Sequence, residues 1–127
     1  MMFTDPRRLS PRISVDGLCG VVTHRDVRPA AMLDLSSLGL RLELPFDPRA
    51  AARTLQLEIE LPGTDEIMWA RGHVTFAHLT PMGGIHPDGQ PRLWCRAGLH
   101  IDVAASRDRR LLREYVTETH RAALLAA

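Results

Sequence analysis

Two groups of residues in this 127-residue chain combine side chains suited to binding phosphate and a guanine base. Arg8 and Arg12 form the first group, and Asp34, Ser36 and Gly39, in the segment DLSSLG, form the second. Arginine presents a planar fork of N–H donors that matches phosphate oxygens and the O6 and N7 atoms of guanine, whereas a carboxylate and a hydroxyl accept from guanine N–H groups. A glycine allows close approach of the backbone. These residue types favour a guanine nucleotide site over a catalytic centre.

The second group is the more specific of the two. All sixteen basic residues are arginines, so the spacing of the first group recurs by composition. The recurrences are Arg49 and Arg53, Arg92 and Arg96, and Arg109 and Arg113. The pattern Asp-x-Ser-x-x-Gly occurs once, and chance would produce it in roughly one chain in sixty of this length. The ordered combination therefore carries more weight than either group alone.

Each group also has a purely structural interpretation. The arginines can belong to a solvated tail without a ligand. Asp34 and Ser36 can stabilise a turn through their own backbone neighbours, and Gly39 can mark a β-bulge. The sequence alone leaves these alternatives open.

Apolar and polar residues alternate along much of the chain, which is typical of half-buried strands. Four such segments supply the predicted inward-facing residues: Leu38, Leu40, Leu42 and Leu44; Leu55, Leu57, Ile59 and Leu61; Met68, Ala70, Val74 and Phe76; and Cys95, Ala97, Leu99 and Ile101. Two further strands are predicted at 18–22 and 29–35, joined by a turn at 24–28. This pattern predicts an all-β antiparallel meander or barrel over residues 13–102.

The last part of the chain changes from strand to helix periodicity. Apolar residues recur at intervals of three and four, which predicts an amphipathic helix over 106–125 with Ser106 as its N-cap and Asp108 in its first turn. The charged face of this helix is expected to be solvated. A partner-binding role for the helix is the alternative.

A segment rich in proline and glycine, Thr80 to Pro91, is predicted to be a mobile hairpin tip. It is either a passive insertion or a partner contact. Cys19 and Cys95 lie in predicted strands, and two cysteines are too few for a zinc site. We expect two reduced core thiols, with a disulfide as the alternative.

Composition and hydropathy exclude several classes of protein. A formal net charge of +1 gives no global attraction to nucleic acid or to an anionic membrane. No apolar run is long enough for a membrane span or a secretory signal, so a cytoplasmic location is expected. The chain has no lysine for a phosphate loop, no Gly-x-Ser-x-Gly segment and no histidine spacing for a metal, so we expect no enzyme. A nucleic-acid binder is disfavoured because only six residues are Phe, Trp or Tyr.

The chain resembles the PilZ domain family of bacterial cyclic di-GMP receptors. The resemblance is carried by RLSPR, by DLSSLG followed by Leu40, and by the later segment RAGLHI ahead of a helix. It implies a six-stranded antiparallel β-barrel with a C-terminal helix. It also implies one domain over 1–127, in which 1–12 is a flexible arginine arm across one mouth of the barrel.

The resemblance assigns roles to six residues. Arg8 and Arg12 would hold phosphates and guanine edges, Asp34 and Ser36 would accept from guanine, and Gly39 would leave room for the base. Arg7 would stack on a guanine plane. The implied protein is a second-messenger receptor that signals to an unidentified effector protein of motility, exopolysaccharide or transcription machinery through ordering of the arm. The alternative is an adaptor of the same fold that binds no nucleotide. The sequence does not say whether one or two ligands bind, or what the oligomeric state is.

Overall fold

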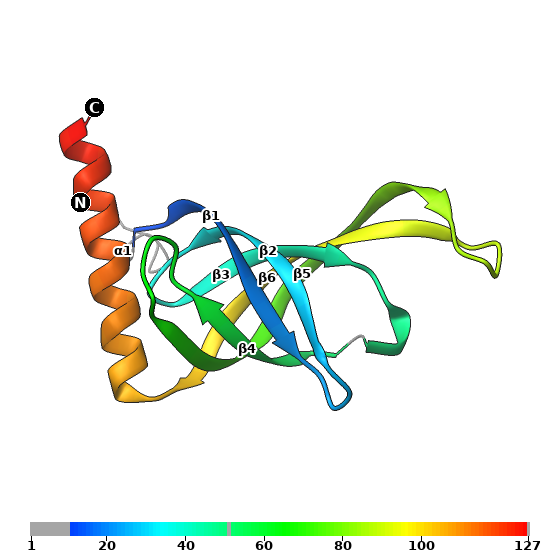
Figure 1. Cartoon of the computed structure of the whole chain (residues 1–127), viewed down its shortest axis with the longest axis horizontal. Helices are drawn as coiled ribbons and strands as arrows, with labels where there is room; N and C mark the ends of the chain where they lie inside the picture. The colour runs from blue at the N-terminus through cyan, green and yellow to red at the C-terminus, as the bar shows by residue number, and fades with distance from the viewer. Residues whose placement is uncertain (1–10, 51, 127) are drawn as a thin grey trace, which may run out of the picture.

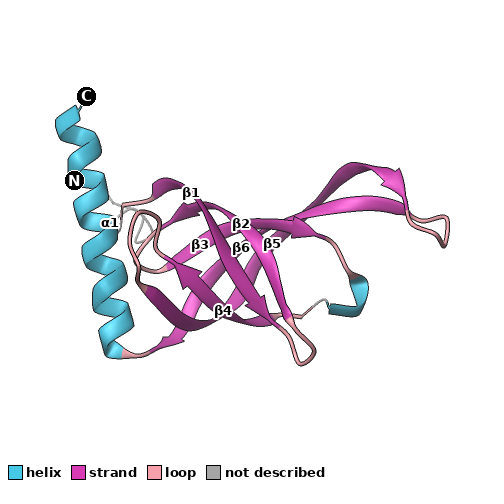
Figure 2. Cartoon of the chain, viewed as in Figure 1, coloured by secondary structure: helices cyan, strands magenta, loops and turns pink. Residues whose placement is uncertain are grey.

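The computed structural model of the chain describes residues 11–50 and 52–126. Its elements are β1 (Ile13–Val22), β2 (Val27–Leu35), β3 (Gly39–Pro45), the 3-10 turn η2 (Pro48–Ala50), β4 (Thr54–Glu60), β5 (Ile67–Ile85), β6 (Pro91–Ala104) and α1 (Ser106–Ala126). The six strands pair antiparallel and close into a barrel in the order β1-β2-β3-β6-β5-β4 (Figures 1 and 2). This confirms the predicted all-β barrel with a C-terminal helix.

The core lies inside the barrel and under the helix. Its most deeply buried side chains are Leu35, Leu42, Leu57, Ile59, Leu61, Met68, Leu112, Val116 and Cys19. The period-two alternation correctly places most inward residues, because a strand presents alternate side chains to opposite faces of a sheet. Two predicted inward residues are instead exposed: Leu38 is 41% exposed and Phe76 is 38% exposed.

Local irregularities explain both exceptions. The register between β5 and β6 shifts between Val74 and Phe76, and a bulge of this kind changes the face to which the following side chains point. Leu38 precedes β3 and lies in a turn, where its carbonyl accepts a hydrogen bond of 2.8 Å from the Ile101 N–H. Neither irregularity is marked in the alternation of the sequence.

The first hairpin is longer than the sequence predicts. β1 begins at Ile13 rather than at Leu18, because a register shift between Ser14 and Gly17 hides the alternation. The Thr23 N–H donates to the Asp26 carbonyl at 2.8 Å, so the turn is tighter than the predicted 24–28 segment.

The segment Thr80 to Pro91 is at the end of a hairpin, as predicted, but most of it is strand rather than loop. β5 and β6 continue as a two-stranded ribbon that projects from the barrel (Figure 1), and only 86–90 connect them. Gly83 and Gly84 have φ values of +85° and +81°, which glycine adopts without strain. They lie within a register shift between Pro81 and Ile85, so the residues that suggested a loop form a bulge within the ribbon.

The helix α1 covers one end of the barrel. Leu112 and Val116 are buried in the core, and the Tyr115 hydroxyl donates to the Pro62 carbonyl at 2.7 Å. The Arg109 N–H donates to the Ala105 carbonyl, so Ala105 occupies the N-cap position predicted for Ser106. In the described part of the chain, no helix combines the length and apolar character needed to span a membrane.

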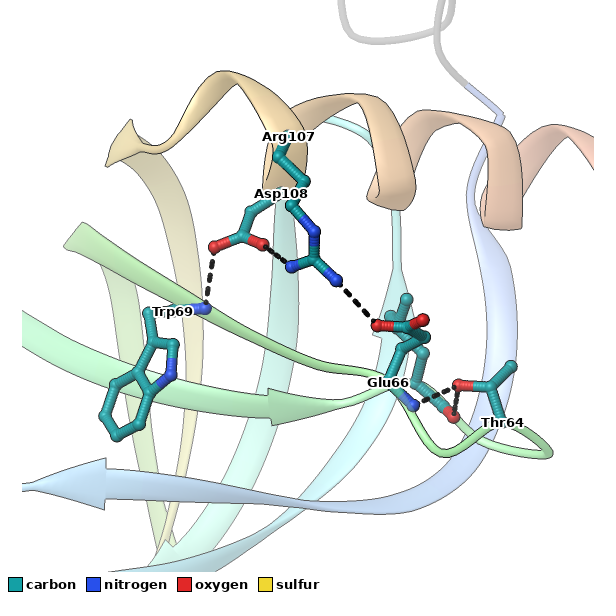
Figure 3. Close-up of polar contacts among 6 residues, drawn as sticks. Thr64, Glu66, Trp69, Arg107 and Asp108 are labelled. Atoms are coloured by element: carbon teal, nitrogen blue, oxygen red, sulfur yellow. Dashed lines mark hydrogen bonds and ion pairs between the residues drawn. The ribbon is translucent and has the colours of Figure 1, made fainter.

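Polar contacts attach the first turn of α1 to the barrel (Figure 3). An Asp108 carboxylate oxygen accepts from the Trp69 N–H at 3.3 Å, and the other oxygen accepts from Arg107 at 3.1 Å. Arg107 also donates to Glu66 at 3.0 Å. The predicted first-turn carboxylate therefore connects the helix to β5.

Candidate functional site

The DLSSLG segment forms the connection between β2 and β3, and Ser36 stabilises it. The Ser36 N–H donates to the Gly39 carbonyl at 2.8 Å, which closes a short turn. The Ser36 Oγ accepts from the N–H groups of Leu38 and Gly39 at 3.2 and 3.1 Å, and its hydroxyl lies 3.2 Å from the Gly39 carbonyl. A serine suits this position because its short side chain can bond to its own turn.

Asp34 is a buried carboxylate at the end of β2. It is 4% exposed and forms an ion pair with the Arg41 Nε on β3, and its other oxygen accepts from the Arg41 N–H at 3.1 Å. The two residues are cross-strand partners. A carboxylate this deeply buried needs a charged or hydrogen-bonding partner, and Arg41 supplies both.

Gly39 allows β3 to approach β6 closely. A Cβ at this position would lie 2.1 Å from the Leu99 carbonyl oxygen, which no real contact permits. Gly72 on β5 approaches the same strand from its other side, since a Cβ there would lie 2.7 Å from the His100 carbonyl oxygen. Both glycines let strands pack tightly around β6.

Arg12 lies beside this turn. Ile13 pairs with Leu35, so Arg12, which directly precedes Ile13, lies at the end of the β1–β2 ladder where the turn begins at Ser36. Arg12 is exposed. Arg7 and Arg8, the other arginines predicted to contribute, lie outside the described residues. The structure thus brings one of the three predicted arginines to the same edge of the barrel as the DLSSLG segment.

Sequence reasoning missed two features of this edge. Arg41 could have been predicted from the sequence as the partner of Asp34, because the two residues flank the turn at equal distances along the chain. His100 could not have been found, because it becomes the cross-strand neighbour of Gly39 only through the long-range pairing of β3 with β6. His100 in turn lies opposite His73 on β5.

An apolar cavity of about 150 Å³ lies at the other mouth of the barrel. Leu44, Phe46, Leu55, Val74 and Cys95 are among its lining residues. Across 11–50 and 52–126 there is no cluster of three or more His, Cys, Asp or Glu side chains placed to hold a metal ion.

Both cysteines are free thiols rather than a disulfide. Burial raises the pKa of Cys19 to about 12, with the negative charge of Glu58 adding to the effect. Burial also raises the pKa of Cys95. Neither thiol has the depressed pKa of a reactive nucleophile.

The profile of the PilZ domain matches residues 6–118, which include the DLSSLG turn, all six strands and the packed part of the helix. The chain belongs to the PilZ domain family. Its closed barrel is therefore a PilZ barrel, and the turn between β2 and β3 is where this chain carries the Asp-x-Ser-x-x-Gly pattern.

Solved structures with the same fold include three proteins of low sequence identity. One is the PilZ domain of YcgR from Escherichia coli with c-di-GMP. The match covers 92% of the present chain and 94% of the YcgR domain chain, with 17% sequence identity and a TM-score of 0.66. The Bacillus subtilis inhibitor of motility, MotI/DgrA, matches 93% of this chain at 16% identity, with a TM-score of 0.67. MrkH from K. pneumonia, in a complex with c-di-GMP, matches 97% of it at 11% identity, with a TM-score of 0.69.

The chain spans 53% of the MotI/DgrA chain and 57% of the MrkH chain, so both contain substantial further sequence. A search of curated proteins finds no match. At these identities, the structural matches establish the shared PilZ fold.

Proposed function

We propose that this PilZ domain is a receptor for cyclic di-GMP. Two of the solved structures of the same fold are described with this ligand. The observation that carries the proposal is the register that sets Arg12 beside the turn holding Asp34, Ser36 and Gly39. This supports the proposal because a cationic donor and two side chains that can accept hydrogen bonds from guanine, separate in the sequence, lie near one edge of the barrel.

In this proposal the arginines bind the phosphates and the turn recognises the base. Arg8 and Arg12 contact phosphate and guanine edges, and Arg7 stacks on a guanine plane. Asp34 and Ser36 accept hydrogen bonds from guanine N–H groups. Each carboxylate or hydroxyl oxygen has two lone pairs, so an oxygen that already accepts one hydrogen bond within the barrel can accept a second from the ligand.

We propose further that the signal is ordering of the arm, residues 1–12, on the barrel. Neutralisation of the arginines by the ligand phosphates would favour this, and an effector protein would bind the altered surface. Ordering several residues costs about 1 kcal/mol or more of backbone entropy each, so the affinity should be micromolar to submicromolar and should weaken as salt increases. Such a receptor would act in the cytoplasm as a single domain and would catalyse no reaction.

A specific observation favours the alternative of an adaptor that binds no nucleotide. Asp34, Ser36 and Gly39 all have partners within the barrel. If these contacts were their whole role, the motif would serve folding, and the chain would act through protein contacts.

Calorimetric titration of the purified protein separates the two functions. We expect heat of binding with cyclic di-GMP and none with GTP or a short single-stranded oligonucleotide. Arg12→Ala should weaken binding by ten- to a hundredfold, since a charged bidentate contact contributes roughly 1.5–3 kcal/mol. The matched control Arg49→Ala, at the far end of the barrel, should bind as the wild type does. No heat with cyclic di-GMP at millimolar concentration would favour the adaptor.

A further inference from the structure

A pair of histidines lies on the outer face of the barrel beside the proposed site. Along one row of paired residues, Gly39 of β3 lies opposite His100 of β6, which lies opposite His73 of β5. Leu99 and Ile101, on either side of His100, are buried, whereas His100 is exposed. The imidazole of His100 therefore points outward from the barrel.

The orientation of the pair is held by a carboxylate. The Nδ1 of His73 lies 2.8 Å from both carboxylate oxygens of Asp102, to which it donates. The ring centroids of His73 and His100 are 5.3 Å apart, and the ring planes are inclined by 40°. Asp102 and His73 thus support the β5 side of the His100 ring.

On its β3 side the His100 ring has no directly paired side chain beside it, because its partner there is the buried Gly39. Directly paired residues on neighbouring strands have Cβ atoms about 5 Å apart, so any side chain at position 39 would lie against His100. Gly39 has none, and its contact with the Leu99 carbonyl excludes every larger residue. A planar group above Gly39 would have the His100 ring on one side and the Ser36 turn on the other.

We infer that His100 is a stacking platform for one guanine base of the ligand, and that His73 is its positioning residue. This inference rests on the proposed function. A base above Gly39 would stack on the imidazole of His100 and direct its hydrogen-bonding edge toward the β2–β3 turn. Stacking on an aromatic ring recognises the flat face of a base, which complements the edge contacts of Asp34 and Ser36. Cyclic dinucleotides carry two such bases, and the phosphates between them would lie toward Arg12.

The test is titration of cyclic di-GMP into His100 variants. His100→Ala should weaken binding about tenfold, because stacking of a base on an aromatic side chain contributes that much or more. His100→Phe keeps a flat ring but removes every polar atom, so its affinity should stay within about threefold of wild type. His73→Ala should weaken binding less than His100→Ala does. His24→Ala, in the exposed turn at the other end of the barrel, is the control and should have no effect.

A ring-current measurement separates stacking from a purely structural role. In the wild-type complex the H8 resonance of one bound guanine should move upfield, and this shift should be lost in His100→Ala and retained in His100→Phe. Wild-type affinity in His100→Ala, or loss of binding in a folded His100→Phe, would overturn the inference while Arg12→Ala still tested the receptor function. If the wild-type protein binds no cyclic di-GMP, both proposals fail.

Discussion

At the scale of single residues, the DLSSLG turn has contacts within the barrel, and in the proposed function it also contacts the ligand. Asp34 is the clearest case, because it is buried and its partner Arg41 is 40% exposed. The contacts between the two residues link β2 to β3, and part of the Arg41 side chain is exposed to solvent. Arg41 is therefore expected to contribute to the stability of the ligand-free protein.

Replacing Arg41 by alanine should destabilise the free protein by about 1–3 kcal/mol. The substitution leaves the buried Asp34 carboxylate without its ion pair, although exposure of Arg41 limits the loss. Urea unfolding of the ligand-free protein measures it. Arg110→Ala, on the exposed face of α1, is the control and should change stability by less than about 0.5 kcal/mol. Equal stability of the two variants would contradict a structural role for the pair.

Replacing Gly39 by alanine should destabilise the barrel by about 3 kcal/mol or more, because the added Cβ would meet the Leu99 carbonyl at 2.1 Å. Gly63→Ala tests conformational strain alone. Gly63 has a φ of +80° with no atom within 4 Å of an added Cβ, so the cost there should be about 1–2 kcal/mol. Thermal unfolding of both variants shows which substitution lowers the stability more. A smaller loss at Gly39 than at Gly63 would show that β3 and β6 separate easily.

The buried thiol of Cys19 should make the protein less stable at alkaline pH. Its folded pKa is raised from 9.0 to about 12, so between these values the thiol ionises in the unfolded chain and stays protonated in the barrel. The unfolded state then binds fewer protons, and stability present below pH 9 is lost as pH rises toward 12. Urea unfolding at pH 8 and pH 11 should show a decline in the wild type that is smaller in Cys19→Ala. Parallel declines in both proteins would rule out this thiol as a cause.

At the scale of elements, the sequence predicts regular strands well and their irregularities poorly. The alternating leucines of β3 and β4 predict burial of Leu42 and Leu57 because the period of a strand is fixed by its geometry. The bulge before Phe76 and the extension of β5 to Ile85 depend on long-range pairing with β6, which no local pattern encodes.

The candidate site divides in the same way. The Ser36 turn and the Asp34–Arg41 pair are local, so their residues could be identified from spacing. The contact of Gly39 with Leu99, and the row that brings His100 beside it, join segments about sixty residues apart and emerge only from the closed barrel. A resemblance to a known family predicted the roles of residues, but not these contacts.

The helix α1 should stabilise the barrel through its first half alone. Leu112 is 1% exposed, and Leu125, on the same helix, is 81% exposed. Leu112→Ala should therefore cost about 2–5 kcal/mol, since it removes buried methyl groups and leaves a cavity, and Leu125→Ala should cost less than about 0.5 kcal/mol. Urea unfolding of both variants measures the difference. Similar costs at the two positions would mean that the end of α1 is also packed in solution.

At the scale of the whole molecule, the site and the core are parts of one closed sheet. The turn between β2 and β3 is bonded to β6 through the Leu38 carbonyl, and β6 pairs with both β3 and β5. A ligand that binds this edge only when the barrel is folded would therefore add its binding free energy to the stability of the entire fold.

Cyclic di-GMP should accordingly raise the global stability of the protein by an amount set by its concentration. A ligand that binds only the folded state adds about 2.7 kcal/mol at one hundred times its dissociation constant, which corresponds to a rise of roughly 10 °C in the unfolding midpoint for a chain of this size. Amide hydrogen exchange should slow throughout β2, β3 and β6, because their slowest amides exchange through opening of the whole barrel. Arg12→Ala at the same ligand concentration should show a much smaller rise, and GTP should produce none. A rise of the same size in Arg12→Ala would place the ligand elsewhere on the barrel. If protection were confined to the β2–β3 turn and the midpoint did not change, the turn would open independently of the barrel, and the coupling between site and core proposed for this fold would be wrong.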